Sequence, residues 1–297
     1  MAENGINNFN LKKRTTRIIL ILLIPLLLVW GLYLFRVGHL SKVPGGELEV
    51  TFFDVGQGDS VLISTPNKKK ILIDGGPPES GVFPLLEKRG IHSLQTVVLS
   101  HPDIDHVGGL IEVVKRIPVE EVLDSGYDGP AQEYKEFLDI IKQKSIPYRV
   151  PLPGEQLNWD QDIVAHILGP LVYYHGTEAD ANNNSLVIRM VYRNVKFLFT
   201  GDIEEIAELD LLDYGREVLH CTILKAPHHG SSSSSTTPFL DWTSPEAVVI
   251  SCGRGNPWGL PHPVVMERYR DYGFRVYRTD WDHTISILTD GHKWKVQ

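Results

Sequence analysis

Ser100-His101-Pro102-Asp103-Ile104-Asp105-His106-Val107-Gly108-Gly109 is the stretch that decides the fold of this 297-residue chain. It lies between a predicted buried strand, Thr96–Ser100, and a predicted helix, Val107–Arg116, and its two glycines allow the backbone to turn sharply. Imidazole with carboxylate is a ligand set for divalent metals. A solvated loop with an aspartate at the helix N-cap explains one carboxylate but not both histidines. The stretch therefore predicts a metal site built from four side chains: His101, Asp103, Asp105 and His106.

Two further loops follow predicted strands in the same way. Gly201-Asp202 follows Val195–Thr200, and His228-His229-Gly230 follows Thr222–Lys225. Loops at one edge of a sheet can meet in a single site, so the three loops together predict a centre for two ions. Asp202 suits a bridging role because a carboxylate has two oxygens, although an aspartate there also suits the N-cap of the following helix.

The order of the predicted elements indicates the architecture beyond these loops. Short β-branched runs alternate with helical patterns from Glu47 onward, and the two halves are alike. This predicts two sheets packed face to face with helices outside. The predicted strands include an antiparallel opening set, a hairpin at Arg193-Asn194 and a final strand; the runs are Glu49–Phe53, Ser60–Ser64, Lys70–Ile73, Glu120–Leu123, Ile163–Leu168, Leu186–Tyr192, Ala247–Ser251 and Thr284–Leu288. The predicted helices are Gln132–Lys144, Glu204–Tyr214 and Val264–Tyr272, and the serine run Ser231–Ser235 is expected to be a flexible loop.

The first 36 residues predict a membrane anchor. Residues 18–35 carry no charge and are long enough to cross a bilayer as a helix. Basic residues gather before this segment, so the positive-inside rule keeps the N-terminus in the cytoplasm and places the rest outside the cell membrane in a single-pass topology. The expected organisation is a cytoplasmic segment at 1–16, an anchor at 17–36, a linker at 37–46 and one domain at 47–297. A cleaved signal peptide is the alternative, but no Ala-x-Ala-like site stands between Arg36 and Gly46.

Composition bounds the function classes. The chain is 42% hydrophobic and 22% charged, which excludes a disordered chain. Its formal net charge of −8 excludes the basic footprint of most nucleic-acid binders, so a polyanionic substrate would need bound metal to reverse the local charge. The two cysteines, Cys221 and Cys252, are too few for a disulfide framework and are expected to be small apolar residues in strands.

Several motifs together resemble a known family. Leu72-Ile73-Asp74-Gly75-Gly76, the His101–His106 loop, Gly201-Asp202 and the later histidines resemble the metallo-β-lactamase-fold hydrolase superfamily. The chain is similar in particular to the hydrolase (nuclease) domain of the ComEC-type competence proteins, from Glu47 to its C-terminus; the motifs that carry this are Phe53–Ser60, Asn182–Ser185, Leu224–Ser231, Ser251–Gly253, Pro261–Pro263 and Tyr277–Asp280. The resemblance implies an α+β fold, a four-layer αββα sandwich with one or two metal ions between the sheets.

The resemblance also implies roles for individual residues. It makes the four polar residues of the His101–His106 loop ligands, Asp202 the bridging carboxylate, and Asp74 the residue that holds the ligand loop. Asp103 stands where most members have a second histidine, and Asn182–Asn184 stand where a third usually follows. Oxygen donors harden a site, so two divalent ions are expected, with Mn²⁺ or Mg²⁺ favoured over Zn²⁺.

The remaining candidates keep alternatives open. Either His229 or His262 fills the last ligand position while the other positions substrate. His228 is a candidate proton donor and Lys225 a candidate phosphate contact, although Lys225 also reads as an ordinary edge-strand lysine. Asp59 either touches the site or stabilises a turn. The other candidates for positioning substrate are Asn184, Arg254 and the serine run.

These residues predict a metal-dependent phosphodiesterase, with DNA favoured as the substrate on the strength of the resemblance. A hydrolase of a small-molecule ester, lactone or β-lactam is the first alternative, since the fold permits it. A non-catalytic, membrane-anchored binding module is the second. One spanning helix cannot form a DNA channel alone, so a role in DNA uptake is a conjecture, and protein partners are not identified.

Overall fold

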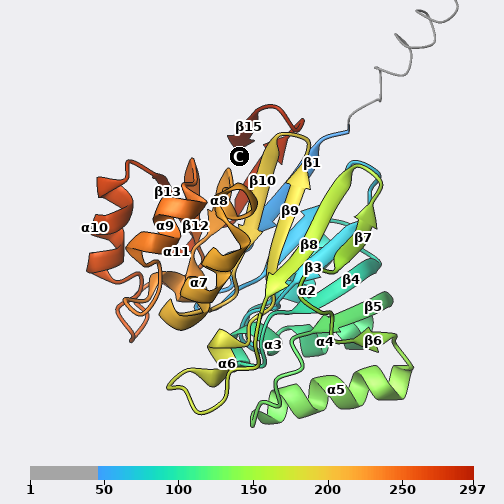
Figure 1. Cartoon of the computed structure of the whole chain (residues 1–297). Coiled ribbons are helices and arrows are strands. Elements are labelled where there is room, and N and C mark those ends of the chain that lie inside the picture. The colour runs from blue at the N-terminus through green and yellow to red at the C-terminus, as the bar shows by residue number, and fades with distance from the viewer. Residues whose placement is uncertain (1–45) are drawn as a thin grey trace, which may run out of the picture. The chain divides into compact units, whose positions relative to one another are not determined.

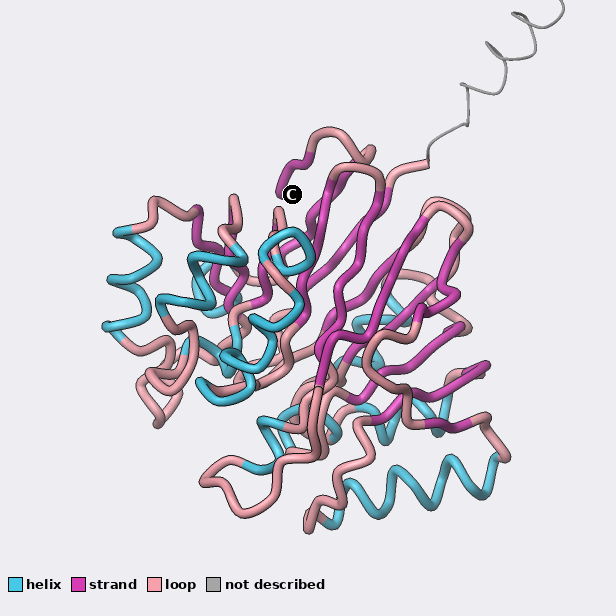
Figure 2. The backbone as a smooth tube through the Cα atoms, viewed as in Figure 1, coloured by secondary structure: helices cyan, strands magenta, loops and turns pink. Residues whose placement is uncertain are grey.

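Two β-sheets organise residues 46–297, the part of the chain that the computed structural model describes. The first sheet contains β1 (Leu48–Phe52), β2 (Val61–Ser64), β3 (Lys70–Ile73), β4 (Leu94–Leu99), β5 (Val119–Asp124), β6 (Tyr148–Arg149), β14 (Ile285–Thr289) and β15 (Trp294–Val296). The second contains β7 (Gln156–Asp160), β8 (Ile163–Gly169), β9 (Val187–Tyr192), β10 (Val195–Phe199), β11 (Ile223–Lys225), β12 (Ala247–Ile250) and β13 (Arg275–Arg278). Figure 2 shows the two groups of strands between helices.

Each sheet changes from antiparallel to parallel pairing along its length. The strand orders are β15-β14-β1-β2-β3-β4-β5-β6 and β13-β12-β11-β10-β9-β8-β7. β1, β2 and β3 pair antiparallel, as expected, and β3 to β6 pair parallel. In the second sheet β9 and β10 form the predicted hairpin, and β10 to β13 are parallel. Parallel strands end at the same edge, and this is where the polar loops of the sequence follow them.

The helices cover the outer face of each sheet (Figure 1). The first set comprises α2 (Val82–Lys88), α3 (Ile104–Val107), α4 (Leu110–Arg116) and α5 (Gln132–Lys144). The second set comprises α7 (Glu205–Leu211), α8 (Arg216–Leu219), α9 (Thr237–Thr243), α10 (Pro263–Asp271) and α11 (Thr279–Asp282), and the short α6 (Asp180–Asn183) lies between β8 and β9 in the sequence. One hydrophobic core, containing Trp159 and Phe197, joins the two sheets. Two more, containing Phe137 and Phe239, join each sheet to its helices. The prediction of two face-to-face sheets with helices outside is confirmed.

The amphipathic pattern of α5 shows how sequence places a helix in this layer. Its buried residues are Tyr134, Phe137, Ile140 and Ile141, which recur at helical spacing on one face. The helix spans the predicted residues 132–144 and ends at Ser145 in the left-handed conformation (φ 53°). Burying each such side chain stabilises the fold by about 1.5–3 kcal/mol, as an upper estimate.

The predicted helix over Val107–Arg116 is wrong in one respect, because it is two helices. α3 ends at Val107 and α4 begins at Leu110. Between them Gly109 donates its N–H to the carbonyl of Gly76 (2.9 Å), and a Cβ on Gly109 would lie 2.1 Å from the oxygen of Gly75. Only glycine permits this approach, which brings the β3 end against the metal-ligand loop.

Two other predictions need correction. The last strand is not the one predicted at Thr284–Leu288, which is β14, but β15, a three-residue strand too short to show an alternating pattern. Cys221 and Cys252 are buried and unpaired, but they lie just before β11 and just after β12 rather than within strands. Their packing role is as expected.

The serine run Ser231–Ser235 is a loop, but the prediction that it is flexible is wrong for its second half. Ser234 and Ser235 are fully buried. Glu208 on α7 accepts hydrogen bonds from the N–H groups of Ser235 (2.5 Å) and Thr236 (2.8 Å), and Arg268 donates to two carbonyls of the run. A buried carboxylate therefore fixes the chain that follows His229.

This carboxylate predicts a specific pH dependence of stability. Burial raises the pKa of Glu208 to about 7, from 4.5. A carboxyl group whose pKa is higher in the folded protein binds its proton more tightly there, so its stabilising contribution is present below pH 4.5 and is lost as pH rises to about 7. Between pH 5 and pH 8 we expect the wild type to lose about 2–3 kcal/mol of unfolding free energy relative to Glu208→Gln, measured by urea titration. The control is Glu205→Gln, an exposed change on the same helix; a Glu208→Gln variant with the wild-type pH slope would contradict this assignment.

None of the helices within residues 46–297 combines the length and apolar character needed to cross a bilayer. The anchor predicted at 17–36 lies outside the described residues.

Candidate metal centre

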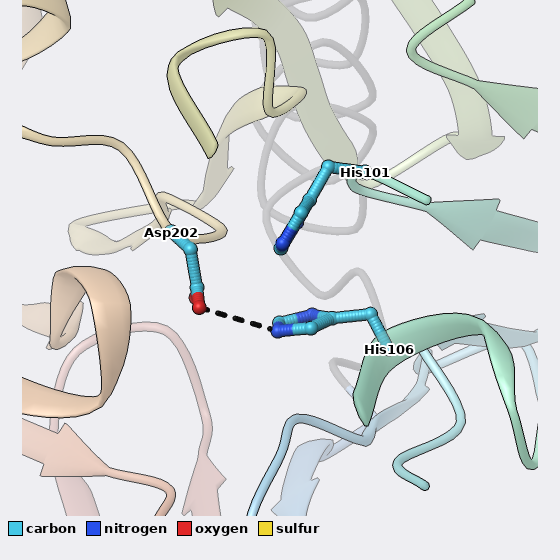
Figure 3. Close-up of side chains that lie close together, drawn as sticks. All are labelled: His101, His106 and Asp202. Carbon is cyan, nitrogen blue, oxygen red and sulfur yellow. Dashed lines mark ion pairs between the residues drawn. The ribbon is translucent and has the colours of Figure 1, made fainter. Parts of the chain in front are cut away.

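Three side chains from two loops converge where the parallel strands end (Figure 3). His101 follows β4, His106 lies in α3, and Asp202 follows β10. The two imidazole rings are fully buried, with centroids 4.1 Å apart. Nε2 of His106 lies 3.3 Å from Oδ2 of Asp202. Loops that are about 100 residues apart in the sequence thus meet at one point between the halves of the fold.

His229 joins the same cluster from the loop after β11. Its Nε2 lies 3.0 Å from Oδ2 of Asp202 and 3.3 Å from Oδ2 of Asp105. Four overlapping groups of possible ligands occur in residues 46–297, and within each group the ligand atoms lie within 4.8 Å of one another. One is His101 with His106 and Asp202, another is Asp105 with His106 and His229, and the other two contain Asp59. The overlap gives the cluster enough donor atoms for more than one ion.

The hydrogen bonds at Nδ1 fix the orientation of two imidazoles. His106 donates from Nδ1 to Oδ2 of Asp74 (2.9 Å), and His229 donates from Nδ1 to the carbonyl of Ser251 (2.9 Å). Both partners are acceptors only, so each ring carries its proton on Nδ1 when neutral and presents the lone pair of Nε2 to the cluster.

Ser100 fixes the orientation of the His101 imidazole. Its N–H and hydroxyl donate to the two oxygens of Asp74 (2.8 and 2.7 Å). The hydroxyl has one proton, so it accepts from Nδ1 of His101 (3.0 Å), and the Nε2 lone pair of His101 again faces the cluster. Asp74 therefore holds the ligand loop through two side chains and one backbone group.

The three Nε2 atoms of His101, His106 and His229 are buried and have no hydrogen-bond partner among residues 46–297. The nearby oxygens of Asp202 are within range of two of them but outside hydrogen-bond geometry. Buried polar atoms are rarely left without partners. Lone pairs of nitrogen and carboxylate oxygens aimed at a shared centre fit a divalent cation.

The electrostatics of the cluster favour positive charge at its centre. Burial lowers the pKa of His106, but the carboxylates of Asp202, Asp74 and Asp105 outweigh burial and raise the pKa well above its ordinary value. Burial raises the pKa of Asp202, but His229, Lys225 and His106 bring it well below its ordinary range. The carboxylates are therefore ionised, and they attract a proton or a metal ion to the imidazoles.

Lys225 lies inside this cluster, so its interpretation as an edge-strand lysine is wrong. β11 is an inner strand, between β10 and β12, and the Lys225 side chain is 2% exposed. Its ammonium donates to the carbonyl of Gly201 (2.9 Å), to Oδ1 of Asp202 (3.1 Å) and to Oδ2 of Asp59. These three acceptors use all its protons, leaving none for a substrate phosphate.

Asp59 reaches the cluster because of Gly58. Gly58 has φ +130°, and a Cβ there would lie 2.2 Å from the carbonyl oxygen of Asp105. The adjacent N–H of Asp59 donates to that same oxygen (3.2 Å). The Asp59 side chain is buried, with Oδ1 at 3.5 Å from Nδ1 of His229. Of its two predicted roles, the structure therefore favours contact with the site.

Three predicted residues lie at the edge of the cluster or away from it. Asp103 is 45% exposed, 3.7 Å from Nε2 of His101, and His228 lies at the rim, 3.0 Å from Oε1 of Glu204. His262 caps α10, where its Nδ1 accepts from the N–H of Val264 (3.3 Å), and it belongs to none of the ligand sets found in residues 46–297.

Asn184 has a structural role instead of facing the cluster. Its amide bonds both backbone groups of Tyr174 and the carbonyl of Asp180. These bonds use both ends of the side chain and tie down the loop before α6, so the proposed contact with substrate has no support in the geometry. The neighbouring Ser185, which the sequence analysis missed, contacts the proposed ligands directly. Its hydroxyl accepts a hydrogen bond from the N–H of Asp202 (3.1 Å) and lies 3.3 Å from Nδ1 of His101.

Three residues of the centre adopt left-handed backbone conformations despite having side chains: Asp74 (φ 57°), His228 (φ 46°) and His229 (φ 53°). Such conformations cost about 1–3 kcal/mol each and persist where the surroundings enforce them, commonly at functional sites. Here they turn the chain at the ends of β3 and β11, so that Asp74 and His229 face the cluster.

Comparison with known proteins agrees with this fold and centre. Residues 53–254 match the Metallo-beta-lactamase superfamily. The chain belongs to that superfamily and is a hydrolase of it. Within the superfamily it is related to the ComEC-type competence proteins: it is 28% identical to ComE operon protein 3 of Bacillus subtilis (80% of this chain, 33% of that protein) and 32% identical to competence protein ComA of Neisseria gonorrhoeae (81% and 32%). Recombination protein 2 of Haemophilus influenzae is also 32% identical (86% and 30%). The chain spans about a third of the length of these relatives.

Two solved structures share the fold at low identity. The metallo hydrolase Igni18 of Ignicoccus hospitalis aligns with a TM-score of 0.55 and 15% identity, over 80% of this chain and 98% of that one. CmlA, a diiron β-hydroxylase from Streptomyces venezuelae, aligns with a TM-score of 0.52 and 14% identity, over 78% and 53%. Both comparisons concern the fold alone.

Proposed function

We propose that this protein is a metal-dependent phosphodiesterase that cleaves DNA. The observation that carries the proposal is the convergence of three unpaired, buried Nε2 atoms with the oxygens of Asp105 and Asp202. This donor set suits divalent ions, and an acidic protein needs such ions to receive a polyanion.

The proposed ligands form two sets that share Asp202. One set is Asp105, His106 and His229, whose ligand atoms lie together in the structure. The other is His101 with Asp103, which lies at the exposed edge of the cluster with its Oδ2 3.7 Å from Nε2 of His101. When bound, the two ions would supply Lewis acidity, polarising phosphoryl oxygens and activating a water molecule. The protein orients the ligands: Asp74 holds the His101–His106 loop, and Lys225 holds Asp202.

The metal preference follows from the ligands. The second set has a single imidazole, His101, beside the carboxylate of Asp103. Carboxylate oxygens are harder ligands than imidazole nitrogens, so Mn²⁺ or Mg²⁺ is proposed in preference to Zn²⁺.

His228 is the proposed proton donor to the leaving oxygen. It is next to the ligand His229 but 26% exposed, so it can reach both substrate and solvent. Oε1 of Glu204 lies 3.0 Å from its Nδ1 outside hydrogen-bond geometry, and its charge favours the protonated ring, whose Nε2 is left for the substrate.

DNA is proposed as the substrate because two of the relatives are named as a competence protein and a recombination protein. The apolar segment at 18–35 supports attachment to the cell membrane with residues 47–297 outside, where incoming DNA would be met. A role in DNA uptake would need other proteins to form the channel.

A small-molecule ester or lactone is the second candidate substrate, because a groove of about 430 Å³ opens beside Asp105. That volume lies in the range of small-ligand sites.

The test uses the full-length chain in mild detergent with Mn²⁺, Mg²⁺, Zn²⁺ or a chelator. Single- and double-stranded DNA and a panel of esters and lactones serve as substrates, and bound metal is counted by mass spectrometry. Cleavage of DNA that requires Mn²⁺ or Mg²⁺ is expected. Protein that binds two ions and cleaves an ester or lactone but not DNA would overturn the nuclease proposal and leave the metal centre standing.

A pair of histidine variants decides which residue is the last ligand. We expect His229→Ala to reduce kcat/KM by about 10²-fold and to lower the metal content, because it removes a buried ligand. We expect His262→Ala to retain full metal occupancy with an effect below tenfold, because His262 caps α10. A reversed order would move the ligand to His262. Thermal unfolding of both variants controls for misfolding.

A further inference from the structure

An exposed tryptophan stands beside the metal centre without a packing role. Trp258 is 66% exposed, although large aromatic side chains usually bury most of their surface. It forms one wall of the groove of about 430 Å³, whose other walls include Pro78 and Ile104. Asp105, a proposed ligand, lines the same groove, so the groove and the metal centre are continuous.

The loop that carries Trp258 is fixed at its base. Asn256 donates to the carbonyls of Gly253 (2.9 Å) and Leu260 (2.7 Å) and accepts from the N–H of Leu260 (2.9 Å). Gly253 in turn donates to Oε1 of Gln57 (3.1 Å), which ties the loop to the segment before Asp59. An exposed aromatic ring on a fixed loop is preorganised for stacking at low entropic cost.

The chemistry of the groove favours an uncharged planar group. Its walls are largely apolar, and the carboxylates of Asp105 and Glu79 lie along it. The carboxylate of Glu79 repels a phosphate, whereas a nucleobase is neutral and stacks on indole. Arg254, exposed in the same loop and in no ion pair within residues 46–297, can contact the adjoining phosphate.

A second aromatic surface lies next to the ligand loop. The rings of Tyr127 and Tyr173 stack with centroids 5.9 Å apart, and Tyr173 is 63% exposed. The loop of Tyr127 packs on the metal-ligand loop, since a Cβ on Gly129 would lie 2.5 Å from Cγ of Pro102. Two separate aromatic surfaces beside the ligand loop suit an extended strand, whose successive bases can stack on them, rather than a compact small molecule.

We propose that the groove beside Asp105 binds one nucleobase of a single-stranded substrate, stacked on Trp258, and so sets the adjacent phosphodiester against the metal centre. This rests on the proposed function for the identity of the substrate. Trp258 is a positioning residue: it holds the base, and the chemistry takes place at the metals.

The test compares the affinities of wild type and Trp258 variants for oligonucleotides with and without bases, and it does not depend on cleavage. Full-length protein in detergent with Mn²⁺ binds a fluorescent, nuclease-resistant phosphorothioate-linked oligothymidylate, or the same charged backbone with abasic residues. Base stacking on an aromatic side chain is worth about 1–3 kcal/mol, so Trp258→Ala is expected to weaken binding of the oligothymidylate about 5–150-fold. It is expected to leave binding of the abasic backbone unchanged, and Trp258→Phe should restore most of the affinity.

Trp281→Ala is the matched control. Trp281 is 64% exposed but does not line the groove, and its ring is covered by the guanidinium of Arg278 at 3.8 Å. Equal affinity of wild type and Trp258→Ala for the oligothymidylate would overturn the base subsite, and so would an equal loss on both backbones. DNA cleavage is measured separately. If the wild type cleaves DNA but Trp258→Ala does not weaken binding of the base-bearing oligonucleotide selectively, the proposed nuclease activity stands and the base subsite is wrong. If Trp258→Ala selectively weakens binding of the base-bearing oligonucleotide but no metal supports cleavage, the base subsite stands and the nuclease activity is wrong.

Discussion

Asp202→Ala is expected to lower kcat/KM on DNA by about 10³-fold or more and to release bound metal. Oδ2 of Asp202 lies 3.3 Å from Nε2 of His106 and 3.0 Å from Nε2 of His229, and both proposed ligand sets share Asp202. Metal ions contribute several kcal/mol of charge stabilisation in the transition state, and each 1.36 kcal/mol corresponds to a factor of ten in rate. The measurements are steady-state kinetics with Mn²⁺ and metal content by mass spectrometry.

Two further variants make this result specific. Asp241→Ala removes an exposed carboxylate on α9 that only binds the hydroxyl of Tyr272, and it should behave as wild type. Asp202→Asn keeps the shape of the side chain but loses the charge, so it should lose most of the metal while remaining folded. If Asp202→Ala kept two ions and wild-type rates, the shared-ligand arrangement would be wrong.

The metal-ligand loops could be predicted from the sequence because their signals are local. A buried strand followed by two histidines, two aspartates and two glycines specifies a loop with convergent ligands, and the same reasoning places Asp202 and His229 at strand ends. The alternating pattern of the strands and the helical spacing of α5 likewise indicate the sandwich. Local spacing is thus sufficient for the layers and for which loops meet.

The roles of the neighbouring residues depend on contacts that local spacing does not encode. Asp59 enters the cluster only because Gly58 lies against the carbonyl of Asp105, a contact between segments that are 47 positions apart. His262 is equivalent to His229 as a motif, but its loop leads into α10, where its imidazole serves as a cap. Asn184 and Ser185 are adjacent polar residues, and only the folded chain shows which of them faces the ligands.

The position of Lys225 also depends on contacts that local spacing does not encode, and it leads to a large expected effect on stability. Its strand is inner rather than at an edge, so its ammonium is buried between the carboxylates of Asp59 and Asp202. Burial lowers the pKa of Lys225, but the two carboxylates reverse this and raise the pKa above its ordinary value of 10.5. The side chain is therefore charged, and its contribution to stability is present below pH 10.5 and is lost only at higher pH.

Lys225→Met is expected to lower the unfolding free energy of the metal-free protein by about 3–5 kcal/mol, because it leaves two buried carboxylates without their cation. Saturating Mn²⁺ should recover much of this loss, since a bound cation stabilises the folded state and neutralises the same oxygens. The measurement is urea titration of wild type and variant, each with chelator and with Mn²⁺. Lys196→Met, on the neighbouring strand β10 and in no ion pair within residues 46–297, is the control and should change little. A Lys225→Met protein as stable as wild type in chelator would mean that the histidines alone balance Asp59 and Asp202, and a loss that Mn²⁺ does not reduce would separate Lys225 from the metal centre.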